Sequence, residues 1–339
     1  MTQTSVEIIG AGVAGLCCAK HFLDRGCKVS LYAASNSIDE SCCSWWAGGM
    51  LAPWCEGENT EPLIVDLGIE GMAFWKEQQH AVTTNGSLVV AQRRDLSELL
   101  QFGRRTSHFN EIGEEQLREL EPDLAQRYTK GLFFEQECHL DPRRALTVLL
   151  ATLLEHEYFE AHFNTPIDNA TLNSPPLSDW RIDCRGLAAR DALPDLRGVK
   201  GEMLILSCKD VTLNRPIRLL HPRHPIYVVP RANNQYMVGA TMIESDDRSN
   251  ASAGSVMELL SSAYALQPAF AQAAVVEIGT DVRPAFTDNL PKLRRRSRTV
   301  YVNGLYRHGF LCAPSLAKRC VALTLDSTVD EQVVDENTD

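Results

Sequence analysis

Short apolar runs and longer apolar stretches alternate along the start of the chain. Residues 6–9 precede a glycine-rich turn, an apolar stretch at 16–23 and a second short run at 28–32. Short apolar runs bounded by turns are typical of buried strands, whereas the longer stretch between them is typical of a helix. The pattern predicts a β-α-β unit at the N-terminus. Further strands are expected at 86–91, 132–134, 180–184, 202–206, 225–229, 236–238, 275–281 and 300–302.

The same periodicity predicts helices at 63–80, 95–106, 113–120, 145–154, 255–266 and 310–325. Asp141 and Pro142 open the fourth of these, since Asp is a favoured cap and Pro fits the first helical position. Strands and helices alternate at the start, whereas strands follow one another in the middle. This favours an α/β fold in which a doubly wound, Rossmann-like nucleotide-binding domain carries an inserted mixed-sheet substrate domain. The expected boundaries are 1–80, 132–198 and 282–326 for the first domain, 81–131 and 199–281 for the second, and 327–339 for an acidic, flexible tail.

The first turn carries three glycines, Gly10, Gly12 and Gly15, between a strand and a helix. In this context they form a dinucleotide-binding fingerprint: the first permits the tight turn, the second lets backbone approach a pyrophosphate, and the third lets helix pack on strand. A plain structural turn is the weaker alternative. Such a motif normally places an acid at the end of the second strand, where Ala33 stands here. Asp39 or Glu40 could substitute for it.

A second glycine-bearing turn, at 303–309, lies between the last predicted strand and the last predicted helix. It has the character of a loop that returns over the same cofactor, which would place Arg307 beside the reacting group. The nucleotide site is therefore expected to be built from both ends of the chain.

Composition narrows the class of protein. A chain of 339 residues favours two domains, and its net charge of −11 argues against nucleic acid or anionic membranes as partners. No apolar run approaches the roughly 20 residues of a membrane span, and the N-terminus lacks a secretory pattern. The 11 cysteines show no CxxC spacing. We therefore expect reduced thiols, no metal site and a cytoplasmic location.

Seven segments together resemble the glycine oxidase (ThiO) family of the D-amino-acid oxidase superfamily, the flavoenzymes of the thiamine pathway. They occur in the family's order and span nearly the whole chain, at 10–15, 46–53, 198–202, 227–231, 238–242, 282–284 and 304–314. The resemblance implies a fold of the D-amino-acid oxidase type with FAD as cofactor. The residues implied for FAD are Gly10, Gly12, Val13, Ala14 and Gly15 at the pyrophosphate, Cys43, Ser44, Gly48, Gly49 and Met50 along the flavin's polar edge, and Leu305, Tyr306, Arg307, His308, Gly309, Phe310 and Leu311 in a loop closing over it.

The resemblance also implies roles for three side chains toward a substrate. Arg283 would hold an amino-acid carboxylate, which its place at a strand end before Pro284 suits. Arg307 would be a second arginine near the substrate, and the Tyr227 hydroxyl would assist. A surface ion pair is the alternative for both arginines; the motif outweighs it for Arg283 and leaves Arg307 evenly balanced. Met242 would be a wall of the pocket or ordinary core.

The activity implied is oxidative deamination of glycine, or of a similarly small amine or D-amino acid, to the imine or oxo acid. Dioxygen would accept the electrons to give hydrogen peroxide, and the product would serve thiamine thiazole synthesis. A sarcosine or D-amino-acid oxidase or dehydrogenase is one alternative, and a catalytically silent flavin-fold partner protein is another. The sequence does not determine whether the protein forms a homo-oligomer.

Overall fold

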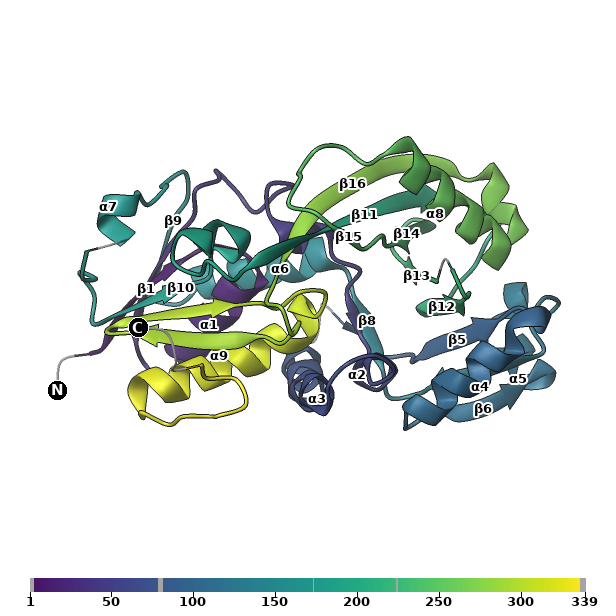
Figure 1. The fold of residues 1–339 in the computed structure, drawn as a ribbon, viewed down its shortest axis with the longest axis horizontal. Helices are drawn as coiled ribbons and strands as arrows, with labels where there is room; N and C mark the ends of the chain where they lie inside the picture. The colour runs from purple at the N-terminus through teal and green to yellow at the C-terminus, as the bar shows by residue number, and fades with distance from the viewer. Residues whose placement is uncertain (1–2, 79–81, 173, 224, 336–339) are drawn as a thin grey trace.

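The computed structural model describes residues 3–78, 82–172, 174–223 and 225–335, which form two domains lying side by side (Figure 1). The domain containing the first and last described residues is built on a six-stranded sheet with the order β17-β18-β10-β1-β2-β9. Its neighbours pair in parallel except β17, which runs antiparallel to β18. The strands are β1 (Ser5–Ile9), β2 (Lys28–Tyr32), β9 (Phe159–His162), β10 (Trp180–Asp183), β17 (Lys292–Arg296) and β18 (Thr299–Asn303).

Helix α1 (Val13–Asp24) connects β1 to β2, as the N-terminal pattern predicts. It begins directly after Gly12 and ends before Gly26, whose φ of 74° lets the chain turn back into β2. Helix α6 (Pro142–Leu154) has the predicted cap, because the Asp141 carboxylate accepts the Arg143 backbone N–H at 2.9 Å. The short helix α7 (Asn169–Leu172) follows β9.

The C-terminal helix α9 (Gly309–Leu325) packs against α1 and against α3 (Pro62–Glu77). Gly71 of α3 lies so close to the Leu311 carbonyl oxygen that a Cβ would overlap it. The Trp75 indole also donates to the Phe310 carbonyl oxygen at 2.6 Å. These contacts fix the start of α9, which borders the site described below.

The second domain is built on a nine-stranded mixed sheet with the order β15-β11-β14-β13-β12-β5-β7-β6, and β16 pairs with β11. The long strands β11 and β16 reach from one domain into the other (Figure 1). Helices α4 (Leu96–Arg105), α5 (Glu114–Leu120) and α8 (Ala253–Leu266) belong to this domain. The strands are β5 (Ser87–Ala91), β6 (Asn110–Gly113), β7 (Lys130–Phe134), β11 (Arg197–Ser207), β12 (Ile217–Leu220), β13 (Ile226–Pro230), β14 (Gln235–Gly239), β15 (Ile243–Glu244) and β16 (Ala274–Ala285).

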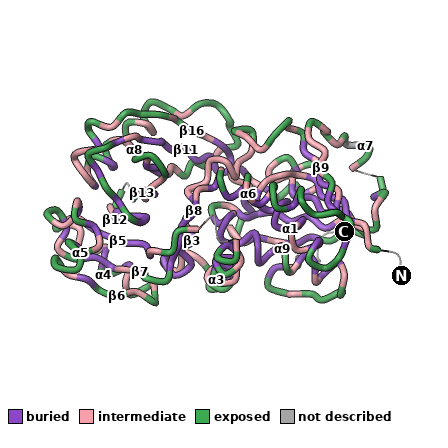
Figure 2. Tube along the Cα trace, turned by 180° about the vertical axis from the view of Figure 1, so that it is seen from behind, coloured by how far each residue is buried: buried purple, intermediate pink, exposed green. Residues whose placement is uncertain are grey.

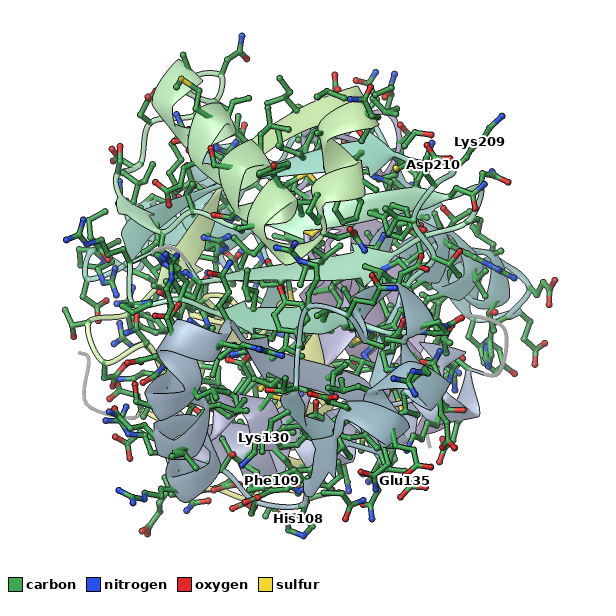
Figure 3. The ribbon with its side chains drawn as sticks, turned by 90° about the vertical axis from the view of Figure 1, so that its right-hand side faces the viewer. His108, Phe109, Lys130, Glu135, Lys209 and Asp210 are labelled. Atoms are coloured by element: carbon green, nitrogen blue, oxygen red, sulfur yellow. The ribbon has the colours of Figure 1, made fainter. Side chains whose placement is uncertain are left out.

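A small sheet, β3-β8-β4, lies where the two domains meet. It consists of β3 (Met50–Leu51), β4 (Val82–Thr83) and β8 (Cys138–Leu140), and the short helix α2 (Pro53–Glu56) follows β3. Buried residues concentrate in the sheets and in the helices between them, with exposed residues on the outer loops (Figure 2). Figure 3 faces the outer end of the second domain, where Lys209 and Asp210 lie exposed at the rim.

The predicted domain boundaries need correction. The boundary between 131 and 132 falls inside β7, which pairs with β5 and β6 and so belongs wholly to the second domain. The boundaries at 198/199 and 281/282 fall inside β11 and β16, which are continuous strands shared by both domains. The sequence pattern misses this because a continuous strand carries no turn signal where it passes between domains.

The prediction of a flexible tail is wrong for residues 327–335. Val333 is buried, and its carbonyl oxygen accepts the Leu293 N–H at 2.7 Å. The Asp335 carboxylate bonds Arg294 of β17 at 2.9 Å, and Asp330 bonds Arg319 of α9 at 2.7 Å. The acidic side chains pair with arginines on the domain instead of repelling one another into solvent. Residues 336–339 lie outside the described residues, as do the last two of the helix expected at 63–80.

None of the helices within the described part of the chain has the length and apolar character that crossing a membrane requires. All 11 cysteines are unpaired, and nine of them are buried.

Candidate active site

A cavity of about 820 Å³ runs between the carboxyl ends of the parallel strands and the inner face of the second domain's sheet. Segments from both ends of the chain line it, including the first glycine turn and the loop before α9. The candidate residues that the resemblance implies for the flavin and the substrate all line this cavity except Gly15. The sequence therefore identified residues that lie 300 positions apart along the chain but share one cavity.

The glycine turn after β1 lies at the nucleotide end of the cavity. Gly10 has a φ of 109°, and a Cβ there would lie 2.5 Å from the Cys184 carbonyl oxygen of the neighbouring strand's end. Gly15 faces the turn itself, since its Cβ would overlap the Gly10 carbonyl oxygen. Gly15 thus permits the close packing of helix on strand expected of it, while Gly12, Val13 and Ala14 present the N-terminus of α1 to the cavity. Helix N-termini favour anionic groups such as phosphates.

The end of β2 has no acid, and the predicted substitutes do not replace it directly. Ala33 lines the cavity, but Asp39 and Glu40 do not. The Asp39 carboxylate instead accepts the hydroxyls of Ser41 at 2.6 Å and Ser37 at 2.9 Å, which lower the pKa of this carboxyl. Ser37 and Ser41 line the cavity, so the part of it beside the end of β2 is bounded by neutral hydroxyls.

Residues 43–50 pass along one side of the cavity. The Ser44 hydroxyl accepts the Val13 N–H at 3.1 Å, which joins this segment to the start of α1. Gly48 has no room for a side chain, because a Cβ would lie 2.7 Å from the ring of Tyr227. Gly49 has a φ of 76°, a conformation that side chains rarely adopt. Backbone, and not side chains, faces the cavity here, and Cys43 beside it is a thiol whose pKa burial raises to about 12.

Arg283 lies at the opposite end of the cavity on β16. Its Nη1 donates to the Thr241 carbonyl oxygen at 3.1 Å, and no described carboxylate lies within 4.0 Å of it. The guanidinium lies flat over β11, because Gly201 beneath it has no side chain. Tyr227 of β13 lines the same end. Arg283 is thus a cation with an unfilled donor edge, able to hold a carboxylate bidentately.

Arg307 is arranged differently. Its Nη2 lies 2.6 Å from Oε2 of Glu56, whose other oxygen lies 2.7 Å from Nη2 of Arg218. The three side chains form a network with one carboxylate between two guanidiniums, in which Glu56 and Arg218 are half-buried and Arg307 is exposed. Burial opposes ionisation of Glu56, but Coulombic attraction to both arginines keeps the pKa of this carboxyl well below its usual value. Arg307 therefore lines the cavity and is also ion-paired with Glu56, and its role toward a substrate stays a prediction.

His308 and Met242 complete this end. Burial lowers the pKa of His308 to about 4, so its imidazole is neutral at pH 7 although Nδ1 lies 3.6 Å from Glu56. Met242 is 54% exposed, and its sulfur lies 3.6 Å from both the Tyr306 hydroxyl and Arg307 Nη1. Met242 is therefore a wall of the cavity mouth and not part of the core.

Three residues of the site had no individual role from the sequence: Glu56, Arg218 and Gly201. Glu56 ends a four-residue helix and Arg218 lies in a short strand, and neither stands in a recognisable motif. Gly201 lay in a family-like segment, but its function becomes visible only with Arg283 above it. The role of each of these three residues can be recognised only from the side chain that it contacts in the folded structure.

The cavity suits a dinucleotide with a redox-active ring. It joins a helix N-terminus free of side-chain bulk at Gly12 to a backbone-lined region at Gly48 and Gly49, and ends at a free guanidinium. Among the described residues that line it, the acids are Glu56 and Asp281, and each has an arginine partner. The fold and the cavity together define a two-domain oxidoreductase that uses a dinucleotide cofactor.

Comparisons with known proteins identify the family. The family model described as FAD dependent oxidoreductase (DAO) matches residues 5–323. The chain is 48% identical over 313 residues to "Putative thiamine biosynthesis oxidoreductase ThiO" of Rhizobium etli, covering 92% of this chain and 94% of that protein. It is 23% identical over 357 residues to glycine oxidase of Bacillus subtilis, covering 96% and 94%. The chain belongs to the FAD-dependent oxidoreductase (DAO) family, within its ThiO and glycine oxidase group, and its cofactor is FAD.

Solved structures confirm the fold class. The crystal structure of glycine oxidase from Geobacillus kaustophilus matches with a TM-score of 0.80 and 20% identity, over 98% of this chain and 96% of that one. Iminodiacetate oxidase from Chelativorans sp. matches with a TM-score of 0.78 and 20% identity, over 96% of both chains. The Rossmann-like domain with an added mixed-sheet domain expected from the sequence is therefore confirmed as a D-amino-acid oxidase type fold.

Proposed function

We propose that this enzyme oxidises glycine, or a similarly small amine, at its α-carbon and passes the electrons to dioxygen. The observation that supports this proposal is Arg283, a cation without an acidic partner. It lies in the same cavity as the glycine turn, at the opposite end. Of the two candidate arginines, it alone has a donor edge unfilled by protein carboxylate. An α-carboxylate fits that edge. In a substrate as small as glycine, few atoms other than the carboxylate remain for the protein to bind.

When bound, FAD accepts two electrons and a proton from the substrate and can pass them to dioxygen. The chain's own contribution is positioning. Arg283 holds the carboxylate, and Tyr227 of β13 lines the same cavity. With glycine the balance is glycine plus dioxygen to the imine of glyoxylate plus hydrogen peroxide, and water then converts the imine to glyoxylate and ammonia.

Among the described residues that line the cavity, we assign none as the base that takes the ammonium proton of the substrate. Glu56 is held between two arginines, and His308 is neutral at pH 7 with a pKa of about 4. Burial raises the pKa of Asp281, but one of its oxygens is paired with Arg248. The substrate must therefore lose its ammonium proton before the C–H bond breaks. Substrate oxidation is accordingly expected to become faster as the pH rises toward the pKa of the amine.

The test is the visible spectrum of the holoenzyme mixed anaerobically with substrate. Glycine is expected to bleach the flavin bands, and Arg283→Ala is expected to abolish bleaching at modest glycine while FAD content stays unchanged. Arg295→Ala, which removes an exposed arginine of β17, is the matched control. Sarcosine, D-proline and iminodiacetate form the comparison panel. Silence with glycine and sarcosine, together with bleaching by bulkier D-amino acids, would replace the proposed substrate.

We also propose that the product serves thiamine synthesis, which the name of the Rhizobium etli relative supports. A host lacking the gene is then expected to need thiamine or its thiazole part for growth. The wild-type gene should restore growth, and the Arg283→Ala gene should not.

A further inference from the structure

Strands β3 and β8 lie antiparallel beside the cavity, with Met50 opposite His139. The same register places Gly49 opposite Leu140, and the Leu140 N–H donates to the Gly49 carbonyl oxygen at 2.9 Å. Such a pair normally exchanges a second bond, here from the Gly49 N–H to the Leu140 carbonyl oxygen. Among the described backbone contacts that bond is missing, because Gly49 has a φ of 76° and turns its Cα toward this oxygen, where a Cβ would overlap it.

The guanidinium of Arg231 takes the place of the missing donor. Its Nη1 donates to the Leu140 carbonyl oxygen and its Nη2 to the Gly48 carbonyl oxygen, both at 2.7 Å. The side chain is only 7% exposed, and Asp141 Oδ2 lies 3.8 Å from Nε. Burial lowers the pKa of Arg231 to about 10, which still leaves it charged at neutral pH. One buried cation therefore holds a carbonyl oxygen of β8 and a carbonyl oxygen of the segment that leads into β3.

These two bonds fix the orientation of two peptide planes. In a trans peptide the carbonyl and the following N–H point in opposite directions. The Gly48 carbonyl points to Arg231 and the Gly49 carbonyl to Leu140, so the N–H groups of Gly49 and Met50 point away from these partners. Gly48, Gly49 and Met50 all line the cavity.

We propose that Arg231 is a positioning residue for the flavin. By binding the carbonyls of Gly48 and Leu140, it releases the N–H groups of Gly49 and Met50 for the polar edge of FAD and places a buried positive charge behind them. The inference rests on the proposed location of the flavin beside residues 48–50. Arginine suits this role better than lysine, because two diverging carbonyls need the two ends of a rigid fork.

The test compares Arg231→Ala and Arg231→Lys with a matched control, Arg215→Ala. Arg215 is also buried, at 10% side-chain exposure, and donates to the carbonyls of Asn85 and Leu120 at 2.8 and 3.1 Å. Neither of these two residues lines the cavity, whereas Gly48, which Arg231 binds, does. Three quantities are measured: the dissociation constant of FAD by titrating apoprotein, the visible flavin spectrum, and the midpoint potential of bound FAD. Stability is measured by chemical denaturation in parallel.

Both Arg231 variants are expected to weaken FAD binding at least about tenfold, or about 1.4 kcal/mol. Both should also shift the flavin bands. Arg231→Ala should in addition make the potential more negative, because a cation that favours the reduced, anionic ring has been removed, whereas Arg231→Lys keeps a charge. Added guanidinium should restore binding to Arg231→Ala. Arg215→Ala should lose stability without altering the spectrum or the potential.

Wild-type FAD affinity, spectrum and potential in both Arg231 variants would overturn the inference, as would equal spectral changes in Arg215→Ala. If Arg231→Ala does not fold, Arg231→Lys carries the comparison. These readouts need no amino-acid substrate. A wild-type flavin that no amine bleaches would therefore refute the proposed function alone, and a flavin bleached by glycine but indifferent to Arg231 would refute this inference alone.

Discussion

Gly201→Ala is expected to impair substrate binding while leaving the fold intact. A Cβ at this position would lie 2.5 Å from Nη1 of Arg283 and closer still to Cζ and Nη2. Ordinary contact begins at about 3.4 Å, so the guanidinium must move by about 1 Å. The obstructed group is the end of a flexible side chain, and β11 accepts alanine without backbone strain, so the unfolding free energy should change by less than about 1 kcal/mol.

Substrate binding should respond far more strongly. A displacement of about 1 Å in a positioning group costs roughly 100-fold in rate, and each bond from a guanidinium to a carboxylate contributes about 1.5–3 kcal/mol. We therefore expect the apparent dissociation constant for glycine, or kcat/KM, to worsen by about 10- to 100-fold. FAD content and spectrum should be unchanged, because Gly201 borders the substrate end of the cavity.

The assay is an anaerobic titration of the flavin bands with glycine, which needs no assumption about the electron acceptor. Gly113→Ala is the control, since a Cβ there meets no atom within 4 Å and the residue has an unstrained φ of −101°. Glycine affinity within about threefold of wild type in a folded, yellow Gly201→Ala enzyme would refute the assignment of Arg283 as the carboxylate site. If Gly201→Ala lost FAD instead, the cavity end assigned to substrate would be wrong.

Three further changes test other parts of the structure. Gly71→Ala should lower the unfolding free energy by about 1–3 kcal/mol in chemical denaturation, because its Cβ meets the rigid Leu311 carbonyl and not a movable side chain. Ala33→Glu should lower the dissociation constant of FAD by about 10- to 100-fold in a fluorescence titration if the ribose lies at the end of β2. Burial raises the pKa of Glu137 to about 7, so the folded protein binds more protons than the unfolded chain, and stability falls as pH rises from about 4.3 to 7. Glu137→Gln should remove a slope of up to about 1.4 kcal/mol per pH unit from denaturation measured across this window, and parallel curves for the two proteins would contradict the assignment.

The elements that the sequence predicts well are those whose signal is local. The first β-α-β unit, the glycine turn and the capped helix after Asp141 all depend on neighbouring residues, and the structure has them where the pattern predicts them. The docked tail was missed for the opposite reason. The acidic residues of this segment indicate disorder by composition. In the structure, however, Asp330 pairs with Arg319 of α9, 11 positions earlier, and Asp335 pairs with Arg294 of β17, 41 positions earlier.

The residues of the site also differ in how well the sequence predicts their roles. Backbone roles such as that of Gly10 could be predicted, because a glycine between a strand and a helix has few structural explanations. Side-chain roles depend on partners that arrive from elsewhere in the fold. Gly201 matters through Arg283, which lies 82 positions later in the numbering, and Glu56 matters through Arg218 and Arg307. No local pattern announces such a pair.

The different roles of the two candidate arginines follow from Glu56. A substrate carboxylate at Arg307 would have to displace a half-buried protein carboxylate that is already bonded at 2.6 Å and shared with Arg218. An incoming carboxylate must therefore replace an ion pair that already exists, which offsets much of what it gains. Arg283 has no carboxylate to displace, so an incoming anion gains its full interaction there. With two guanidiniums and one carboxylate, the Glu56 network still leaves one positive charge beside the cavity. We therefore expect Arg307 to act through the potential it helps create, and Arg283 through direct contact with the substrate carboxylate.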